Sequence, residues 1–84
     1  PCVVLSPNEM NKYLRTVVIA PMTSANKPYP TRVVVTHNEI NGQVVLDQIR
    51  TIDKSRIIRS FGELTSEEIQ DCKSVIKQTY VDWP

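Results

Sequence analysis

The stretch Val44-Val45-Leu46-Asp47-Gln48-Ile49-Arg50-Thr51-Ile52-Asp53 changes its apolar phase halfway along. As far as Leu46 the pattern is that of a strand with two distinct faces. Continued alternation would bury Gln48, but the apolar residues instead resume at Ile49. A bulge or bend at Asp47-Gln48 absorbs such a slip, and bulges often re-aim side chains beside functional sites. We therefore expect a binding surface where an acidic and an amide side chain meet a bent apolar strand.

Length and composition favour one small soluble domain. The 84 residues are enough for a single core, and no apolar run is long enough to span a bilayer, so no membrane partner is expected. Cys2 and Cys72 lie near opposite ends of the chain, which is consistent with reduced thiols in the cytoplasm. With one histidine, His37, no CxxC motif and no clustered carboxylates, no metal or other cofactor is expected. His37 is expected to be exposed.

The net charge of +1 conceals an asymmetry along the chain. Residues 12–59 carry eight Lys and Arg against three Asp and Glu, whereas residues 60–84 carry two against five. The central segment is therefore able to attract a polyanion. Solvated strand edges also carry Lys and Arg for solubility, and charge alone favours that simpler interpretation.

Runs rich in β-branched residues alternate with turn signals along the chain. Besides the opening stretch, strands are expected at Cys2–Leu5 (a buried one), Thr16–Ala20 (closed by Pro21), Thr31–Thr36 and Arg56–Ser60. The connections are expected to be a short helix Asn8–Tyr13 that begins after Ser6-Pro7, a loop Met22–Pro30, a turn at Asn41-Gly42 and a turn at Asp53-Lys54-Ser55.

A C-terminal helix is the element with the clearest signals. Thr65 is a plausible N-cap with Glu68 three residues on, which is the pattern of a capping box. Apolar residues then recur at helical spacing, at Ile69, Cys72, Val75, Ile76, Tyr80 and Trp83. We expect Ile69, Cys72, Ile76 and Tyr80 to face inward, with Cys72 as a small core residue. The fold class is thus mainly β (α+β), a small antiparallel barrel-like sheet with one helix packed on it.

The chemistry-bearing residues do not form a familiar catalytic set. A single histidine excludes a pair of histidines as acid and base, and the only two glycines, Gly42 and Gly62, form no phosphate loop. What remains is the hydroxyl pair Thr23-Ser24, the Asp47-Gln48 pair and several cations. Hydroxyl, amide and guanidinium groups hold phosphates and read base edges. Taken alone, Thr-Ser after a strand is most often just a turn.

Read together, these motifs resemble the MazF/PemK family of toxin endoribonucleases. The matching segments span essentially the whole chain, and they are Pro1-Cys2-Val3-Val4-Leu5-Ser6-Pro7, Ala20-Pro21-Met22-Thr23-Ser24, Tyr29-Pro30-Thr31-Arg32-Val33, and the run from Val44 to Lys54. The part from Asp47 to Lys54 is the most specific, and Pro21-x-Thr23 comes next.

The resemblance implies a fold and an activity. It implies a small SH3-like β-barrel (CcdB/PemK-like) with a terminal helix, acting as a homodimer in the cytoplasm. The family cuts single-stranded RNA, chiefly messenger RNA, at short sequences without a metal, and leaves a 2′,3′-cyclic phosphate and a 5′-hydroxyl. A cognate antitoxin blocks the RNA groove. These properties are expectations for residues 1–84 as one toxin domain.

The resemblance also assigns residues. By position Thr23 is the catalytic threonine, Asp47 and Gln48 line the RNA groove, and Ser24 and Arg32 are further candidates for RNA contact. Family members carry an N-terminal strand and a loop that ends in a catalytic arginine immediately before the position of Pro1. We expect this segment to be missing from the chain.

Two other functions remain open at this point. One is a gyrase poison on the same fold, as in CcdB-like toxins, with Trp83 as a contact residue, although a core tryptophan that anchors the helix is the favoured interpretation of Trp83. The other is a non-catalytic SH3-like interaction module. A comparison of RNA cleavage with supercoiling inhibition separates the first alternative from the ribonuclease.

Overall fold

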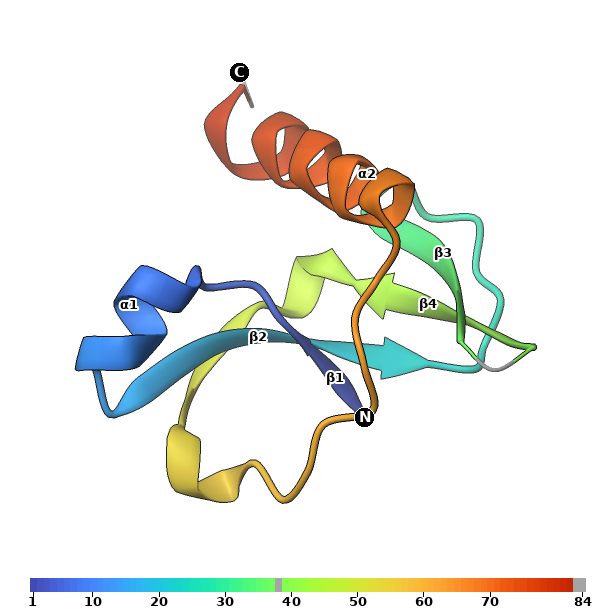
Figure 1. The fold of residues 1–84 in the computed structure, drawn as a ribbon. Helices are drawn as coiled ribbons and strands as arrows, with labels where there is room; N and C mark the ends of the chain where they lie inside the picture. Colours follow the sequence, from blue (N-terminus) through green and yellow to red (C-terminus); the bar gives the residue numbers. More distant parts are fainter. Residues whose placement is uncertain (38, 83–84) are drawn as a thin grey trace.

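A computed structural model describes residues 1–37 and 39–82 (Figure 1). The strands are β1 (Cys2–Val4), β2 (Thr16–Thr23), β3 (Arg32–His37), β4 (Ile40–Val45) and β5 (Arg50–Asp53). The helices are α1 (Asn8–Tyr13) and α2 (Ser66–Ile76), which continues into a wider π-helical turn, Lys77–Val81. Two short 3₁₀ turns are η1 (Leu46–Gln48) and η2 (Lys54–Arg56).

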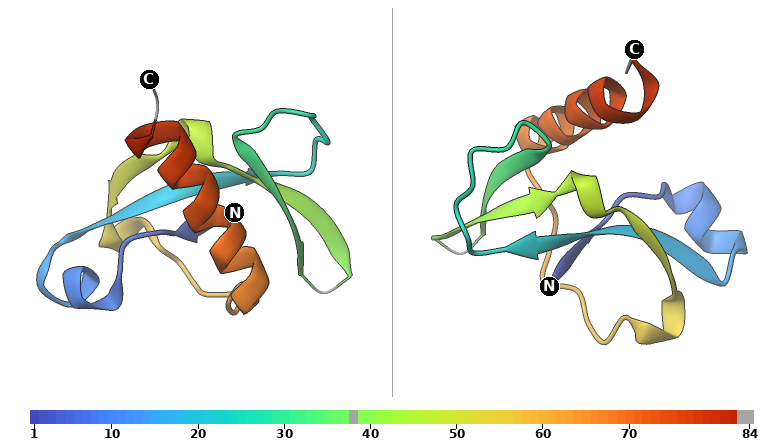
Figure 2. Two further views of the ribbon diagram at one scale, coloured as in Figure 1. Left: turned by 90° about the horizontal axis from the view of Figure 1, so that it is seen from above. Right: turned by 180° about the vertical axis from the view of Figure 1, so that it is seen from behind.

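The strands form one antiparallel sheet around β2, the longest strand. The order is β1-β2-β4-β3, and β5 pairs with β2 as well. β4 pairs with the end of β2 at Met22 and Thr23, while β5 pairs with its beginning, from Thr16 to Ile19. β4 and β5 therefore follow each other along the same edge of β2, and the sheet curls into a half-barrel with α2 above it (Figures 1 and 2). The expected antiparallel barrel-like sheet with a C-terminal helix is confirmed.

The predicted bend lies between β4 and β5. The chain is buried from Gln43 to Leu46, which is fully inaccessible, and then turns through η1. The N–H of Leu46 donates to the carbonyl oxygen of Thr31 at 3.1 Å, which fixes the start of the turn. Asp47 and Gln48 are exposed there, as the break in the apolar pattern predicted.

The main core lies between the sheet and α2. Its buried members are Ala20, Val33, Val35, Val44, Leu46 and Cys72. Cys72 is only 4% exposed, and burial raises the pKa of its thiol, so its expected role as a small core residue is confirmed. The hydroxyl of Tyr80 donates to the carbonyl oxygen of Leu46 at 2.6 Å, which ties the end of the helix to η1.

Replacement of Ile76, which is partly buried, with Ala is expected to lower the free energy of unfolding by about 2 kcal/mol, the lower end of the usual range for large-to-small core substitutions. Ile76 packs against the core from the last turn of α2. Because small domains are only marginally stable, this loss is expected to unfold much of the population. Thermal and urea melts followed by circular dichroism measure it. An unchanged melt would contradict the packing of α2 described above.

The predicted capping box at the start of α2 is present and also joins the helix to β3. The side chain of Thr65 accepts from Glu68 N–H, and Glu68 accepts in return from Thr65 N–H at 2.9 Å. The other Glu68 oxygen accepts from the N–H of Thr36 at 2.8 Å. The hydrogen bonds from Thr65 and then Thr36 hold the pKa of Glu68 below its ordinary value.

A depressed carboxyl pKa makes stability depend on pH. The contribution of Glu68 is fully present above its unfolded pKa near 4.5 and is lost as the pH falls through the lower folded value. Glu68→Gln is therefore expected to be less stable than the parent at neutral pH and to lose less stability below about pH 4.5. Urea melts across this range measure it, with the neighbouring exposed Glu67→Gln as the matched control. Equal pH slopes for Glu68→Gln and the parent would show that this carboxylate does not provide the link.

Several expected elements differ in the structure. β1 is not a buried strand, because Cys2 is exposed and Val4 is 44% exposed. Only Val3 and the following Leu5 pack toward the core. The reason is that β1 is the last strand at one side of the sheet, and among the described residues nothing covers its outer face. Pro21 does not end β2, because the strand runs on to Thr23. A proline, which has no backbone N–H, is tolerated in a strand where that N–H would not donate to a neighbouring strand.

The predicted Asn-Gly turn is also wrong. Asn41 and Gly42 lie inside β4, opposite Thr36 and Val35. The chain reverses before Ile40, where Glu39 has a φ of 66°. The local signal failed because glycine here serves close strand packing rather than a turn.

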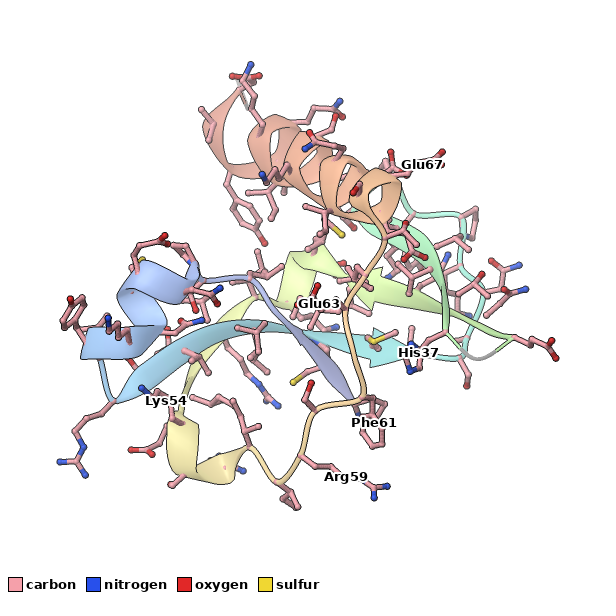
Figure 3. The ribbon with its side chains drawn as sticks, in the orientation of Figure 1. His37, Lys54, Arg59, Phe61, Glu63 and Glu67 are labelled. Atoms are coloured by element: carbon pink, nitrogen blue, oxygen red, sulfur yellow. The ribbon has the colours of Figure 1, made fainter. Side chains whose placement is uncertain are left out.

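The expected strand Arg56–Ser60 is absent. Arg56 ends η2, and the residues after it run without strand pairing below the sheet toward α2 (Figure 3). Ile57 is 41% exposed and Ile58 is 95% exposed. Their β-branched side chains favour a strand, but this segment pairs with no strand of the described sheet. The turn at Asp53 is confirmed, because its carboxylate accepts from Ser55 N–H at 2.8 Å.

Two helix residues differ from their expected burial. Ile69 is 38% exposed and Tyr80 is 53% exposed despite its inward hydroxyl. Glu68 already faces β3, so Ile69, about 100° further round the helix, turns toward solvent. His37, expected to be exposed, is half-buried, and Gly62 lies close to its ring. Trp83 lies outside the described residues.

Candidate functional site

Thr23 is the last residue of β2, not a loop residue as its sequence neighbours suggested. Its hydroxyl oxygen accepts a hydrogen bond from the N–H of Ala25 at 3.1 Å. A hydroxyl has one proton to donate, and this contact does not use it. The side chain is half-buried, and Ser24 follows it at the exposed start of the β2–β3 loop. Thr23 is thus held in place, and no group among residues 1–37 and 39–82 accepts its proton, which is therefore available to an incoming acceptor.

Gly42 allows β4 to approach Thr23 closely. Thr23 pairs with Gln43 across the two strands. A Cβ at Gly42 would lie 3.1 Å from the carbonyl oxygen of Thr23, which is tighter than ordinary contact. A larger residue at this position would therefore displace the end of β2.

Arg32 and Asp47 lie together where the β2–β3 loop ends and β3 begins. Arg32 Nε lies 3.7 Å from Asp47 Oδ1, an ion pair too long for a direct hydrogen bond. The hydroxyl of Thr31 donates to the same carboxylate oxygen at 2.9 Å. The guanidinium also lies over the ring of Tyr29, 4.9 Å from its centroid, and the side chain of Arg32 is only 13% exposed. Both residues therefore help to hold the end of the loop.

Thr23 and Arg32 project from the same face of the sheet. Thr23 pairs with Gln43 and Arg32 pairs with Val45, and directly paired residues share a face. Gln43 and Val45 are two residues apart on one strand, so they share that face too. Val44, between them, belongs to the core on the opposite face. The structure thus brings Thr23 and Arg32 onto one face of the sheet, opposite the core residue Val44, with Arg32 at the edge where β3 meets α2.

The side chain of Gln48 makes no described hydrogen bond to the rest of the protein. It is exposed in η1, and none of the hydrogen bonds described for residues 1–37 and 39–82 involves its amide. An amide that satisfied backbone groups inside the bend would be hydrogen-bonded there. Gln48 is therefore available to a ligand, whereas the neighbouring Asp47 already has two partners.

Gln48→Ala is accordingly expected to leave the melting temperature unchanged and to weaken RNA binding or its selectivity by about tenfold, the scale of one base contact. Melting curves and RNA affinity measured on the same preparation decide the matter. The exposed Gln70→Ala on α2 is the matched control. A lowered melting temperature with unchanged RNA affinity would assign Gln48 to the bend instead.

The β1–β2 register extends to the site. Cys2 pairs with Pro21, and the N–H of Met22 donates to the carbonyl oxygen of Pro1 at 3.1 Å. One further step in this antiparallel register places a residue joined to Pro1 opposite Thr23. Directly opposite residues share a face, with Cβ atoms about 4.5–5.5 Å apart. A side chain joined there would lie beside the Thr23 hydroxyl.

Sequence reasoning missed Gln43 and Tyr29. Gln43 is a polar side chain 5% exposed, directly opposite Thr23. An amide in an apolar strand has to find buried partners, and this requirement was the signal that could have singled it out. Tyr29 carries no such signal, because its contact with Arg32 depends on how the loop folds back.

The described parts of the chain also limit other kinds of site. Within residues 1–37 and 39–82, no three His, Cys, Asp or Glu side chains are grouped to hold a metal ion. Over the same residues, no helix is both long and apolar enough to cross a lipid bilayer.

Comparison with known proteins assigns the family. Residues 1–80 match the family described as PemK-like, MazF-like toxin of type II toxin-antitoxin system. Over 77 residues the chain is 34% identical to the endoribonuclease toxin MazF of Escherichia coli K12, covering 90% of this chain and 69% of that protein. The chain therefore belongs to the PemK/MazF family of toxins, whose named homologues are endoribonucleases.

Solved structures show the same fold. A mycobacterial endoribonuclease in complex with its cognate antitoxin superposes with a TM-score of 0.89 at 24% identity, over 100% of this chain and 84% of that one. A MazE–MazF structure from Deinococcus radiodurans gives a TM-score of 0.81 at 28% identity, over 93% and 81% of the two chains. The half-barrel with its C-terminal helix is thus the fold of MazF-type toxins.

Proposed function

We propose that this toxin binds single-stranded RNA on the sheet face that carries Thr23 and Arg32, and cleaves it in the cytoplasm without a metal. The family assignment supports the reaction class. The observation that carries the proposal is the hydrogen bonding of Thr23, whose oxygen accepts from Ala25 N–H and whose proton has no acceptor in the part of the chain that the structure describes. A fixed hydroxyl donor is suited to a phosphoryl oxygen that gains negative charge during reaction.

The proposed reaction is an internal transesterification. The 2′-oxygen of a ribose attacks the adjacent phosphorus, and the bond from phosphorus to the 5′-oxygen of the next nucleotide breaks. The products are a 2′,3′-cyclic phosphate and a 5′-hydroxyl. One proton leaves the 2′-hydroxyl and one is delivered to the departing oxygen, so no water is consumed. Thr23 donates to the phosphoryl oxygen, while a cation beside it balances the added charge.

Each predicted site residue has a place in this scheme. Thr23 contacts the reacting phosphate, and Ser24 at the exposed loop start contacts the same strand of RNA. Gln48, in η1 just after β4, contacts a base. Arg32 and Asp47 hold each other and the loop end, with Arg32 adding positive charge to the face. These roles rest on position and hydrogen bonding.

We further propose that the toxin is a homodimer that binds a cognate antitoxin. Ile58 and Phe61, on the segment between η2 and α2, are 95% and 61% exposed, and Arg59 lies over the Phe61 ring (Figure 3). Such exposed apolar side chains favour protein contacts. Light scattering during size-exclusion chromatography measures the oligomeric state, and a monomer at all concentrations would contradict the dimer.

The function is tested on one long single-stranded RNA in the presence of EDTA. The proposal expects cuts with 5′-hydroxyl ends, which polynucleotide kinase labels without prior phosphatase treatment. Supercoiling by gyrase, assayed with the same preparation, is expected to be unaffected. Inhibited supercoiling with intact RNA would overturn the proposal in favour of a gyrase poison.

A further inference from the structure

The side chain of Gln43 makes all its described hydrogen bonds to the β2–β3 loop. Its Oε1 accepts from the N–H of Lys27 at 3.1 Å, and its Nε2 donates to the carbonyl oxygen of Lys27 at 2.8 Å and to Asn26 Oδ1 at 3.5 Å. One side-chain amide thus pairs with both backbone groups of a single loop residue, as a neighbouring strand would. Because the side chain is buried, loss of these bonds leaves polar groups without partners.

The held loop closes one side of a small hollow beside Thr23. The hollow has a volume of about 170 Å³. Its lining residues are Ser24, Ala25, Asn26, Val34, Asn41, Gly42 and Gln43. Pockets for whole small-molecule ligands are larger, roughly 300–1,000 Å³, so this one suits a single planar group. It borders the proposed cleavage position, because Gln43 is the cross-strand partner of Thr23.

The lining of the hollow has the chemistry of a base-reading site. Asn41 Oδ1 accepts from the Thr36 hydroxyl at 2.7 Å, which leaves the side-chain nitrogen Nδ2 of Asn41 to donate to a base edge. Ser24 adds a hydroxyl and Val34, 59% exposed, adds an apolar surface for the plane of a base. Single-stranded RNA is read by such combinations of edge hydrogen bonds and contact with the base plane.

We propose that Gln43 is a positioning residue that fixes the β2–β3 loop, and that the hollow so formed takes one nucleobase of the RNA next to the cut. The inference rests on the proposed RNA-binding function and adds to it the residue that sets selectivity at one nucleotide. Gln43 also lines the hollow, but its amide is already hydrogen-bonded to the loop. It acts through Asn26 and Lys27, whose positions it holds.

Gln43→Met keeps the length of the side chain and removes both ends of the amide. Exchange of the Lys27 amide hydrogen with solvent is expected to be up to about tenfold faster, because its acceptor is gone. Short random-sequence single-stranded RNAs captured by the variant and sequenced are expected to lose the base preference at one position, a fall in discrimination of about tenfold. Gln70→Met, on the exposed surface of α2, is the matched control and is expected to behave as the parent.

Val34→Tyr tests the hollow without changing Gln43. Val34 is exposed on β3, and tyrosine suits a strand, so the fold is expected to hold. The ring fills the hollow, and the base preference is expected to disappear at the same position as in Gln43→Met. Thr51→Tyr, at an exposed position of β5, is the control for adding a ring to a strand. If Gln43→Met does not fold, the base preference of Val34→Tyr alone tests whether the hollow binds a base.

The outcomes separate the inference from the function on which it rests. Capture of RNA by the parent with an unchanged preference in the folded variants overturns the role of Gln43 and the hollow, and leaves the RNA-binding function standing. Failure of the parent to capture RNA overturns the proposed function itself. Loss of preference at one shared position supports both.

Discussion

Joining to Pro1 a segment that ends in arginine is expected to raise the rate of RNA cleavage by about a hundredfold or more, the scale of one preorganised charge-stabilising group. The β1–β2 register places the added residue opposite Thr23 on the same face. Thr23 is a neutral hydroxyl and a poor acid or base near pH 7. A guanidinium beside it supplies the positive charge that the pentavalent phosphorus requires.

The control is the same segment ending in glutamine. Glutamine is also a polar hydrogen-bond donor on an unbranched stem and extends the strand equally well, but it is shorter and carries no charge. Single-turnover cleavage of one RNA substrate compares the two extended proteins with the chain that begins at Pro1. Equal rates for the arginine and glutamine forms would show that charge at this position does not matter, and the cation would then have to be sought elsewhere, Arg32 and Arg50 included.

Thr23→Val in the arginine-extended protein is expected to lower the cleavage rate by about a hundredfold or more, with little change in RNA affinity. Valine has nearly the shape of threonine and favours strands, so β2 is expected to form as before. The proton offered to the phosphoryl oxygen is lost, whereas the contacts made by Gln48 and the loop remain. Cleavage rate and RNA affinity, measured separately, show this difference.

Two further variants sharpen the test of Thr23. Thr23→Ser keeps the hydroxyl and is expected to retain most of the rate. Thr16→Val makes the same replacement at the exposed beginning of β2 and is expected to change nothing. If Thr23→Val instead weakens binding and leaves the rate of bound RNA unchanged, Thr23 serves recognition and not the chemical step.

The elements that could be predicted from sequence are those whose signals are local. The capping box of Thr65 and Glu68 depends on residues three apart, and the bend at Asp47 depends on a break in alternation within one stretch. The predictions were wrong where tertiary packing overrode a local sequence signal. Asn41-Gly42 resembles a turn, but Gly42 is needed for the close approach of β4 to Thr23.

The candidate site could be predicted in part for the same reason. Thr23 and Gln48 were indicated by motifs, and the structure places both at accessible positions on or beside one strand. The ion pair of Arg32 with Asp47 and the hydrogen bonds of Gln43 join residues fifteen or more apart in sequence. Such contacts depend on how the β2–β3 loop folds over the sheet, and alternation or spacing carries no signal for that.

The most direct test of the central claim is to map the ends of one long single-stranded RNA after treatment with the arginine-extended protein in EDTA, beside its Thr23→Val form. We expect cuts confined to a short recurring sequence, all with 5′-hydroxyl ends, and their near-complete loss in Thr23→Val. Cuts that require a divalent ion, or that persist at the same rate without the Thr23 hydroxyl, would contradict the account.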